Sequence, residues 1–161
     1  AGAEAGGLRS TGPESSTMVL VPLIADHVKI PVVAAGGIAD SRGYKAAFAL
    51  GAQGVQIGTR FMAATESPIH NKWKEQIVNC DDGGTELLPV DNMMMRAIIT
   101  PELRARIQSP GFDVKKEFRL ANASKAWNSA EFDLVPAGAG EVSALIKDIK
   151  SVKEIIEEMV K

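Results

Sequence analysis

The sequence has little cysteine, few aromatic residues and no excess of positive charge. Its 161 residues include one cysteine, Cys80, which excludes an internal disulfide and leaves a cysteine-rich metal site without ligands. The 18 Lys and Arg against 20 Asp and Glu give a net charge of -2, so the chain lacks the basic surface that binding a nucleic-acid backbone requires. We therefore expect no bound metal, no nucleic-acid partner and a reducing compartment such as the cytoplasm.

Long apolar runs are missing as well. No stretch approaches the roughly 20 consecutive apolar residues that cross a bilayer, and the first residues lack the charged and then apolar order of a signal peptide. The content of 45% apolar and 24% charged residues is instead typical of a folded globular protein. We expect no membrane partner.

Two short apolar runs that each end in glycine are the clearest local signals in the chain. Residues 30–37 are a β-branched run that ends in two glycines, and residues 54–59 repeat the pattern with one glycine. Between them, residues 40–51 begin with a capping aspartate, carry apolar residues at helical spacing and end in glycine. Strand, glycine turn, helix, strand and glycine turn make a βαβ unit of a parallel sheet, so the sequence predicts an α/β fold.

The spacing of apolar residues also predicts the elements around this unit. We expect a loop over residues 1–16, a helix over 17–27, a helix over 67–79 capped by Ser67, an extended segment over 86–90, a helix over 93–107 that restarts at Thr100 and Pro101, and an amphipathic helix over 142–159. An amphipathic helix of this kind packs on a core or against a second copy of the chain, which leaves a homodimer open.

The two glycine turns suggest anion binding. A strand that ends in glycines lets backbone N–H groups approach a phosphate without a Cβ in the way, and the following helix adds the positive end of its dipole. Two such turns in adjacent βα units can hold one phosphate from two sides, as the turns after the seventh and eighth strands of a (β/α)8 barrel do. The alternative is that the glycines only form tight turns in the sheet.

Three motifs in a fixed order carry a resemblance to a known family. Residues 4–7 (Glu-Ala-Gly-Gly), residues 30–40, and residues 54–61 with the following Glu66 resemble the motifs of the nitronate monooxygenase family of FMN enzymes, also called 2-nitropropane dioxygenases. The resemblance covers about residues 1–80. It implies a TIM barrel with FMN as the cofactor.

The resemblance also implies which residues hold the cofactor. Gly6 would lie close to the flavin, and the turn after the first strand would supply backbone donors to the FMN phosphate. The second strand would end in the other phosphate motif, in which the hydroxyl and N–H of Thr59 are donors. The implied cofactor residues are Gly6, Gly36, Gly37, Gln56, Ile57, Gly58 and Thr59.

The chain departs from the family at one position that matters for chemistry. In the family motif the two glycines are followed by a histidine that acts as a base or positions the substrate, and here that position is Leu8. A leucine accepts no proton, so no base would remain to remove the C–H proton of a neutral nitroalkane. Arg9 or Glu14 could replace the missing group, and the alternative is that both lie in a solvated loop. No catalytic residue is assigned.

The resemblance and this departure favour one reaction and leave others open. An alkyl nitronate is already anionic, so its oxidation with O2 to a carbonyl compound and nitrite needs no base. The first alternative is a flavin-dependent enoyl-acyl carrier protein reductase that uses NAD(P)H to reduce an enoyl thioester, because residues 70–74 (His-Asn-Lys-Trp-Lys) are similar to a segment of that branch. The second is a flavin-binding fragment without catalysis. Barrel enzymes of the inosine monophosphate dehydrogenase type are disfavoured, because Cys80 lies beyond both phosphate strands.

The remaining reactive side chains are expected to have structural roles. His27 ends a helix, where a partly charged ring complements the helix dipole. His70 is expected at the surface, and Cys80 is expected to be an inert thiol at a helix end. Residues 93–95, three methionines in a row, are expected to fill a core or an interface, with the lining of an apolar pocket as the alternative.

The length of the chain bears on its completeness. If the two predicted strands are the seventh and eighth of a barrel, a closed barrel of roughly 250 residues does not fit into this sequence. We therefore expect the C-terminal part of a larger flavoenzyme. In that arrangement residues 1–80 supply the last βα units, and residues 81–161 form a helical or irregular extension that packs on the barrel.

Overall fold

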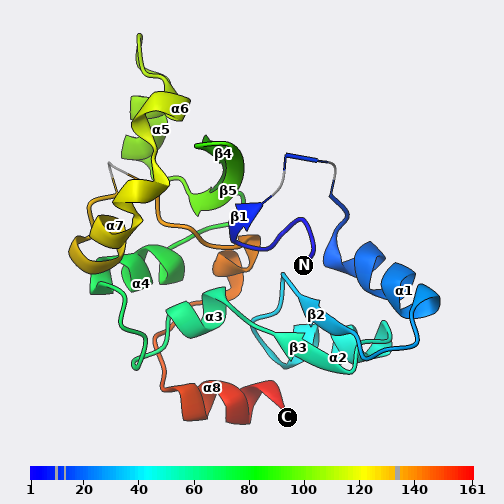
Figure 1. Cartoon of the computed structure of the whole chain (residues 1–161). Coiled ribbons are helices and arrows are strands. Elements are labelled where there is room, and N and C mark those ends of the chain that lie inside the picture. Colours follow the sequence, from blue (N-terminus) through cyan, green and yellow to red (C-terminus); the bar gives the residue numbers. More distant parts are fainter. Residues whose placement is uncertain (10, 13, 133–134) are drawn as a thin grey trace.

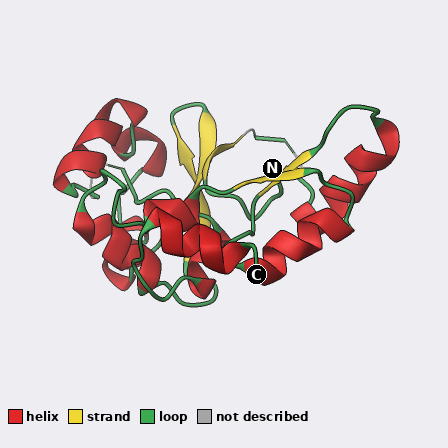
Figure 2. Cartoon of the chain, turned by 90° about the horizontal axis from the view of Figure 1, so that it is seen from below, coloured by secondary structure: helices red, strands yellow, loops and turns green. Residues whose placement is uncertain are grey.

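A computed structural model of the chain describes residues 1–9, 11–12, 14–132 and 135–161. Ser10 and Pro13, which belong to the loop expected at the start of the chain, lie outside the described residues. The strands form two sheets, and helices lie on both sides of them (Figure 1, Figure 2). The predicted α/β class is therefore confirmed.

The predicted βαβ unit is present. Strands β2 (Val33–Ala35) and β3 (Gly54–Gln56) pair in parallel, and helix α2 (Ser41–Ala49) connects them. Asp40 caps this helix as the sequence predicted, because its carboxylate accepts the N–H of Arg42 at 2.9 Å. Both strands end at the same edge of the sheet, which brings the two glycine turns together.

A second, antiparallel sheet was not predicted. Its strands are β1 (Gly7–Arg9), β5 (Met93–Ile98) and β4 (Thr85–Val90), in that order. The expected extended segment in β4 is confirmed, but the loop expected at residues 7–9 and the helix expected at residues 93–98 are wrong. The methionines of β5 suit a helix by local propensity, and pairing with a strand on each side decides against it.

The helices are mostly where the sequence places them. Helix α1 (Thr17–His27) has the predicted bounds, and α5 (Pro101–Ile107) restarts the chain after Thr100 as expected. Helix α4 (Asn71–Val78) begins later than predicted, because the side chain of His70, and not that of Ser67, caps it. The other helices of this part are α3 (Thr59–Met62), α6 (Val114–Glu117), the 3-10 helix η1 (Leu120–Asn122) and α7 (Ala123–Ser129). None of the helices in the described ranges combines the length and the apolar character needed to span a membrane.

The single amphipathic helix expected over residues 142–159 is wrong. The chain instead forms a 3-10 helix, η2 (Glu141–Leu145), an irregular stretch, and then α8 (Val152–Met159). The apolar residues of this region belong to two different clusters. Ile146 packs with Trp73 and Phe118 in the larger core, whereas Ile155 packs with the residues around β2 and β3. One straight helix could not reach both cores.

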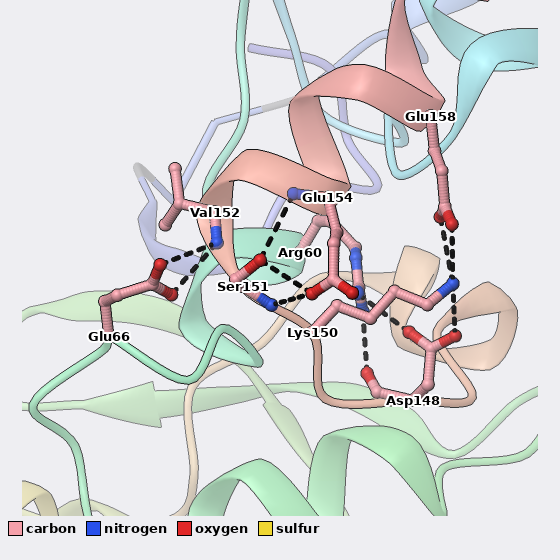
Figure 3. Close-up of polar contacts among 8 residues, drawn as sticks. All are labelled: Arg60, Glu66, Asp148, Lys150, Ser151, Val152, Glu154 and Glu158. Atoms are coloured by element: carbon pink, nitrogen blue, oxygen red, sulfur yellow. Dashed lines mark hydrogen bonds and ion pairs between the residues drawn. The ribbon is translucent and has the colours of Figure 1, made fainter.

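Polar contacts fasten α8 to the rest of the molecule (Figure 3). The guanidinium of Arg60 in α3 donates to the backbone carbonyl and to the carboxylate of Asp148, both at 2.8 Å. Lys150 donates to Glu158 at 2.9 Å. Glu66, from the family motif, accepts the first backbone N–H of α8 at 2.9 Å. These contacts fix the last helix beneath the parallel strands.

Candidate functional site

A cavity of about 410 Å³ lies where the glycine turns meet the N-terminal residues and helices α4 and α7. The residues that the sequence assigned to a cofactor all line it: Gly6, Gly36, Gly37, Gln56, Ile57, Gly58 and Thr59. Leu8, at the family's histidine position, lines it too. The structure therefore brings three separate motifs to one cavity.

The glycines of both turns line the cavity. Gly36 and Gly37 have φ angles of 96° and 71°, a left-handed conformation that other residues adopt only with strain. Gly58 has ordinary angles, and a Cβ built on it would meet no atom within 4 Å. Thr59 begins α3, so its N–H has no acceptor inside the helix. These turns leave room for a ligand to contact the main chain.

The hydroxyl of Thr59 already has one partner within the protein. Its oxygen accepts the N–H of Gly140 at 3.0 Å, in a buried position. This bond uses a lone pair, and the hydroxyl proton is left for a ligand. Thr59 can therefore connect the second glycine turn to η2 and still act as a donor.

Two buried arginines hold the N-terminal loop, residues 1–6, against the cavity. Arg9 donates to the carbonyl of Gly2 at 2.8 Å and to that of Ala5 at 2.7 Å. Arg96, from the middle strand β5, donates to the carbonyl of Ala3 at 3.2 Å. Because these donors are charged and buried, they fix the path of the loop more firmly than neutral donors would.

Glu4 joins the same loop to three other segments. Its carboxylate accepts the first N–H of α1, from Thr17, at 3.0 Å, and its backbone carbonyl accepts the N–H of Glu141 at 2.9 Å. A Cβ on Gly37 would lie 3.1 Å from the Glu4 side chain. The second glycine of the Gly-Gly turn and the start of α1 are thus positioned by the loop that carries Gly6.

Arg9 and Glu14 are not placed to replace the missing base. Their side chains form an ion pair at 2.6 Å, and neither residue lines the cavity. The alternative expectation of a solvated loop is also wrong for Arg9, which is only 7% exposed. The role of this pair is to hold the N-terminal loop.

Another part of the lining is apolar and aromatic. It includes Met62, Trp73, Met95 and Trp127. Trp73 is 3% exposed, and its ring meets that of Trp127 edge to face with centroids 5.5 Å apart. Its indole Nε1–H has no hydrogen-bond partner in the described part of the chain, a state that costs about 1–3 kcal/mol in a buried donor.

No ionisable side chain lines the cavity among the described residues. The wall can therefore hold an anionic group through backbone N–H groups and a flat apolar group against the tryptophans. It offers no side chain that could take a proton from a carbon atom.

The other residues singled out from the sequence lie away from the cavity, with one exception. The ring of His27 contacts the carbonyl of Leu23 in its own helix at 2.7 Å, which fits the predicted structural role. His70 caps α4, and burial raises the pKa of the Cys80 thiol, which makes it a poor nucleophile. Met95 is the exception, because it lines the cavity as well as the core. No group of three or more His, Cys, Asp or Glu in the described ranges is arranged to hold a metal ion.

Sequence reasoning missed the aromatic wall and the arginine from β5. A signal for Trp73 was available, because Ile69, Trp73 and Ile77 follow one another at helical spacing and all three are buried. Arg96 gave no signal, since its role depends on a strand pairing that no local pattern predicts.

An α/β fold with a glycine-lined cavity defines a class of ligand-binding enzyme domains, and comparisons with known proteins identify the family. The sequence model of the nitronate monooxygenase family matches residues 1–161. A probable nitronate monooxygenase of Bacillus subtilis is 33% identical over 98% of this chain and 49% of its own length. One of Staphylococcus aureus is 43% identical over 87% of this chain and 43% of its own length. The chain belongs to the nitronate monooxygenase family.

Solved structures share the fold of this chain. FabK from Thermotoga maritima superposes with a TM-score of 0.83 and is 36% identical, over 99% of this chain and 51% of that one. A nitroalkane oxidase from Streptomyces ansochromogenes has the same fold, with a TM-score of 0.76 and 24% identity over 98% of this chain and 48% of its own. The chain thus spans about half the length of the relatives that it matches from end to end.

Proposed function

We propose that this chain is part of an FMN-dependent oxidoreductase of the nitronate monooxygenase type, which oxidises alkyl nitronates with O2 to a carbonyl compound and nitrite. The observation that carries the proposal is a cavity that unites all the implied cofactor residues and has no ionisable side chain in its described wall. A substrate that is already an anion needs no base, so this wall suits a nitronate better than a neutral nitroalkane.

The residues of the cavity fit FMN. The backbone of Gly36, Gly37 and Gly58, which line the cavity, would hold the phosphate, with the Thr59 hydroxyl as a further donor. The apolar wall would hold the flat ring, and the volume falls within the roughly 300–1,000 Å³ of small-molecule sites. Bound there, FMN would supply the electron transfer between the substrate and O2.

The chain's own residues bind and orient the ligands, and they do not move protons. Leu8 puts an apolar side chain where the family has a proton acceptor, so this chain's part of the wall favours a substrate that is already deprotonated. Met95 and Trp127 add apolar surface to the lining. The reaction therefore depends on the charge that the substrate brings.

We also propose that β2 and β3 are the last two strands of a TIM barrel whose other strands lie outside this chain. β2 pairs only with β3 in the described part of the chain. Next to its free edge, helix α1 exposes a row of large apolar side chains, among them Met18, Val19 and Leu23. Neighbouring βα units of a longer chain would cover this surface.

A second candidate is the flavin-dependent enoyl-acyl carrier protein reductase, with NAD(P)H as the electron donor. The apolar wall would suit an acyl chain, and the similarity to FabK extends over the whole chain. Hydride transfer through the flavin, like nitronate oxidation, has no need of a base at Leu8.

The experiment that separates the candidates uses the full-length protein that contains this chain. Visible absorption tests for flavin bands near a one-to-one ratio, and two assays follow nitrite release from an alkyl nitronate and NAD(P)H-dependent loss of an enoyl thioester. Nitrite release without thioester reduction supports the first candidate. Thioester reduction without nitrite supports the second, and a colourless protein that takes up no added FMN overturns both.

A further inference from the structure

The strand pair of β1 and β5 turns one face of its sheet to the cavity. Leu8 and Met95 lie directly opposite each other in the antiparallel register, and both line the cavity. The next pair, Arg9 and Met94, lies outside the described lining. Residues opposite each other share a face of the sheet, and successive residues alternate between faces. The side chains of Leu8 and Met95 are therefore the ones that face the cavity.

A second apolar face of the lining comes from η1 and α7. Leu120, Ala123 and Trp127 line the cavity at spacings of three and four residues. Ala121, which lies between the first two, is exposed and is not part of the described lining. Spacings of three and four place residues on one side of a helix. One side of this helical segment therefore faces the cavity.

The β4–β5 hairpin joins the two faces. Asp91 lies at its turn, and its carboxylate accepts the N–H of Leu120 at 3.0 Å and pairs with the guanidinium of Arg119 at 2.7 Å. Met95 belongs to the larger core, and Leu120 packs against that core. The hairpin that carries Met95 thus also holds the start of the helical face. We call Leu8, Met95, Leu120 and Ala123 the apolar subsite.

The chemistry of the apolar subsite favours one kind of occupant. A phosphate and the polar edge of a flavin ring both need hydrogen-bond partners, and these four side chains offer neither a charge nor a hydrogen-bond donor. Leu8 is 46% exposed, and Leu120 and Ala123 are half-buried, so apolar surface remains for a ligand to cover. A hydrocarbon chain gains most from such a surface, because it loses no hydrogen bond to water when it is buried.

We propose that the apolar subsite holds the alkyl chain of the substrate and that Ala123 limits the length of that chain. This inference rests on the function proposed above, and it narrows the substrate to nitronates with an uncharged chain of several carbon atoms. Ala123 has the smallest side chain of the four, so a larger residue there shortens the space. Each methylene that the subsite buries should raise kcat/KM about fourfold.

The matched variants are Ala123→Leu and Ala121→Leu in the full-length protein. They make the same change two positions apart, inside and outside the described lining. The substrates are the nitronates of nitroethane, nitrobutane and nitrohexane. We expect Ala123→Leu to lower kcat/KM about tenfold for the longest and less than about twofold for the shortest. Ala121→Leu should keep the wild-type dependence on chain length, and both variants should keep their flavin absorbance.

Alkyl carboxylates give a readout besides activity. Their planar, anionic head resembles that of a nitronate and is not oxidised. By isothermal titration calorimetry of the wild-type protein, we expect the Kd to fall about fourfold for each methylene from butyrate to hexanoate. Adipate, which has the length of hexanoate and a second charge, should bind at least about tenfold more weakly than hexanoate. Ala123→Leu should remove the gain from butyrate to hexanoate, and Ala121→Leu should keep it.

The outcomes separate this inference from the proposed function. Nitrite release without any dependence on chain length, or an equal loss in both variants, overturns the apolar subsite and leaves the proposed function standing. Loss of flavin from Ala123→Leu with an unchanged dependence on chain length assigns this face to the cofactor and also overturns the subsite. Carboxylate affinity that follows chain length in a wild-type protein that releases no nitrite supports the subsite and overturns nitronate oxidation. The absence of both effects overturns both proposals.

Discussion

Glycines of the same cavity differ in what they do, and substitution can separate their roles. At Gly6 a Cβ would lie 2.4 Å from the backbone nitrogen of Gly140, whereas at Gly58 it would meet nothing within 4 Å. Gly6 is therefore needed for the packing of the protein itself. Packing within the protein does not require glycine at position 58. A ligand that approaches the backbone there would explain why a side chain is absent.

We accordingly predict that Gly58→Ala weakens FMN binding without unfolding the protein. The new methyl group would occupy the approach of the phosphate, and we expect the Kd to rise roughly tenfold, about 1.4 kcal/mol. The thermal midpoint should stay within a few degrees, because the φ of -98° suits alanine. Flavin fluorescence titration and thermal unfolding measure the two effects. Gly6→Ala is the comparison, and in that variant both the affinity for FMN and the thermal midpoint should fall. An unchanged affinity for FMN in Gly58→Ala would contradict the prediction.

Under the proposed function, Leu8 leaves the substrate to bring its own negative charge. Its side chain is 46% exposed at the cavity, so a histidine fits there without a buried charge. We predict that Leu8→His gains turnover of neutral nitroalkanes, with little change for nitronates. The neutral imidazole is the base, so the new rate should rise with pH through about 6.5 and level off above it. Nitrite release at pH 5 to 8 tests this, with Leu8→Gln as the control that should gain nothing.

The sequence predicted one side of the cavity and not the other, for a physical reason. The glycine turns are local, since each follows its own strand within a few residues. The roles of Trp73 and Arg96 arise from contacts with segments distant in the chain, which a single sequence does not encode in any nearby pattern.

At the level of elements, capping residues and glycines gave the most accurate predictions of where helices begin and strands end. Asp40 and Thr100 cap the helices that the sequence assigned to them. Strand β5 was mistaken for a helix because its identity depends on its partners β1 and β4, and α8 was predicted too long because apolar spacing alone does not say which core a residue faces. The structure of these elements was determined by the segments that they pair or pack with, and not by the local propensities of their residues.

The attachment of α8 depends on the charge of Asp148. Burial by itself would raise the pKa of this carboxyl, but the hydrogen bond from Lys150 and the charge of Arg60 outweigh burial and lower the pKa. A carboxylate with a lowered pKa stabilises the fold above its unfolded pKa, near 3.9, and loses that contribution as pH falls through the lower folded value. Acid should therefore weaken the attachment of this helix.

We predict that Asp148→Asn lowers the free energy of unfolding by about 1 kcal/mol at pH 7, a modest value because Asp148 is half exposed. The difference from wild type should be smaller at pH 3, because the contribution of the carboxylate declines once the pH falls below the unfolded pKa, near 3.9, towards the lowered folded pKa. Urea unfolding at the two pH values measures it. Lys153→Gln, which breaks an exposed ion pair on the same helix, is the control and should have little effect at either pH. A constant difference across the pH range would rule out this account.

At the scale of the whole molecule, helix α1 exposes several large apolar side chains to solvent. Val19 and Leu23 are 56% and 49% exposed. We predict that Val19→Glu with Leu23→Lys reduces self-association of the isolated chain, as light scattering would show, because the pair removes part of an apolar patch. In the full-length protein the same pair should cost about 3 kcal/mol, since there the face would be covered. Lys29→Gln, which adds no charge to this face, is the control. Equal light scattering by the double variant and by Lys29→Gln would count against the proposal that this face of α1 is normally covered.

The N-terminal loop is closed by partners that come much later in the chain. Arg96 reaches Ala3 across 93 residues, and Gly140 reaches Thr59 across 81. Contacts of such separation form late in folding. During synthesis, the ribosome must therefore release residues beyond Gly140 before the cavity has its walls. Under the proposed function, flavin uptake would follow translation, and a truncated nascent chain that already carries every glycine motif would remain colourless.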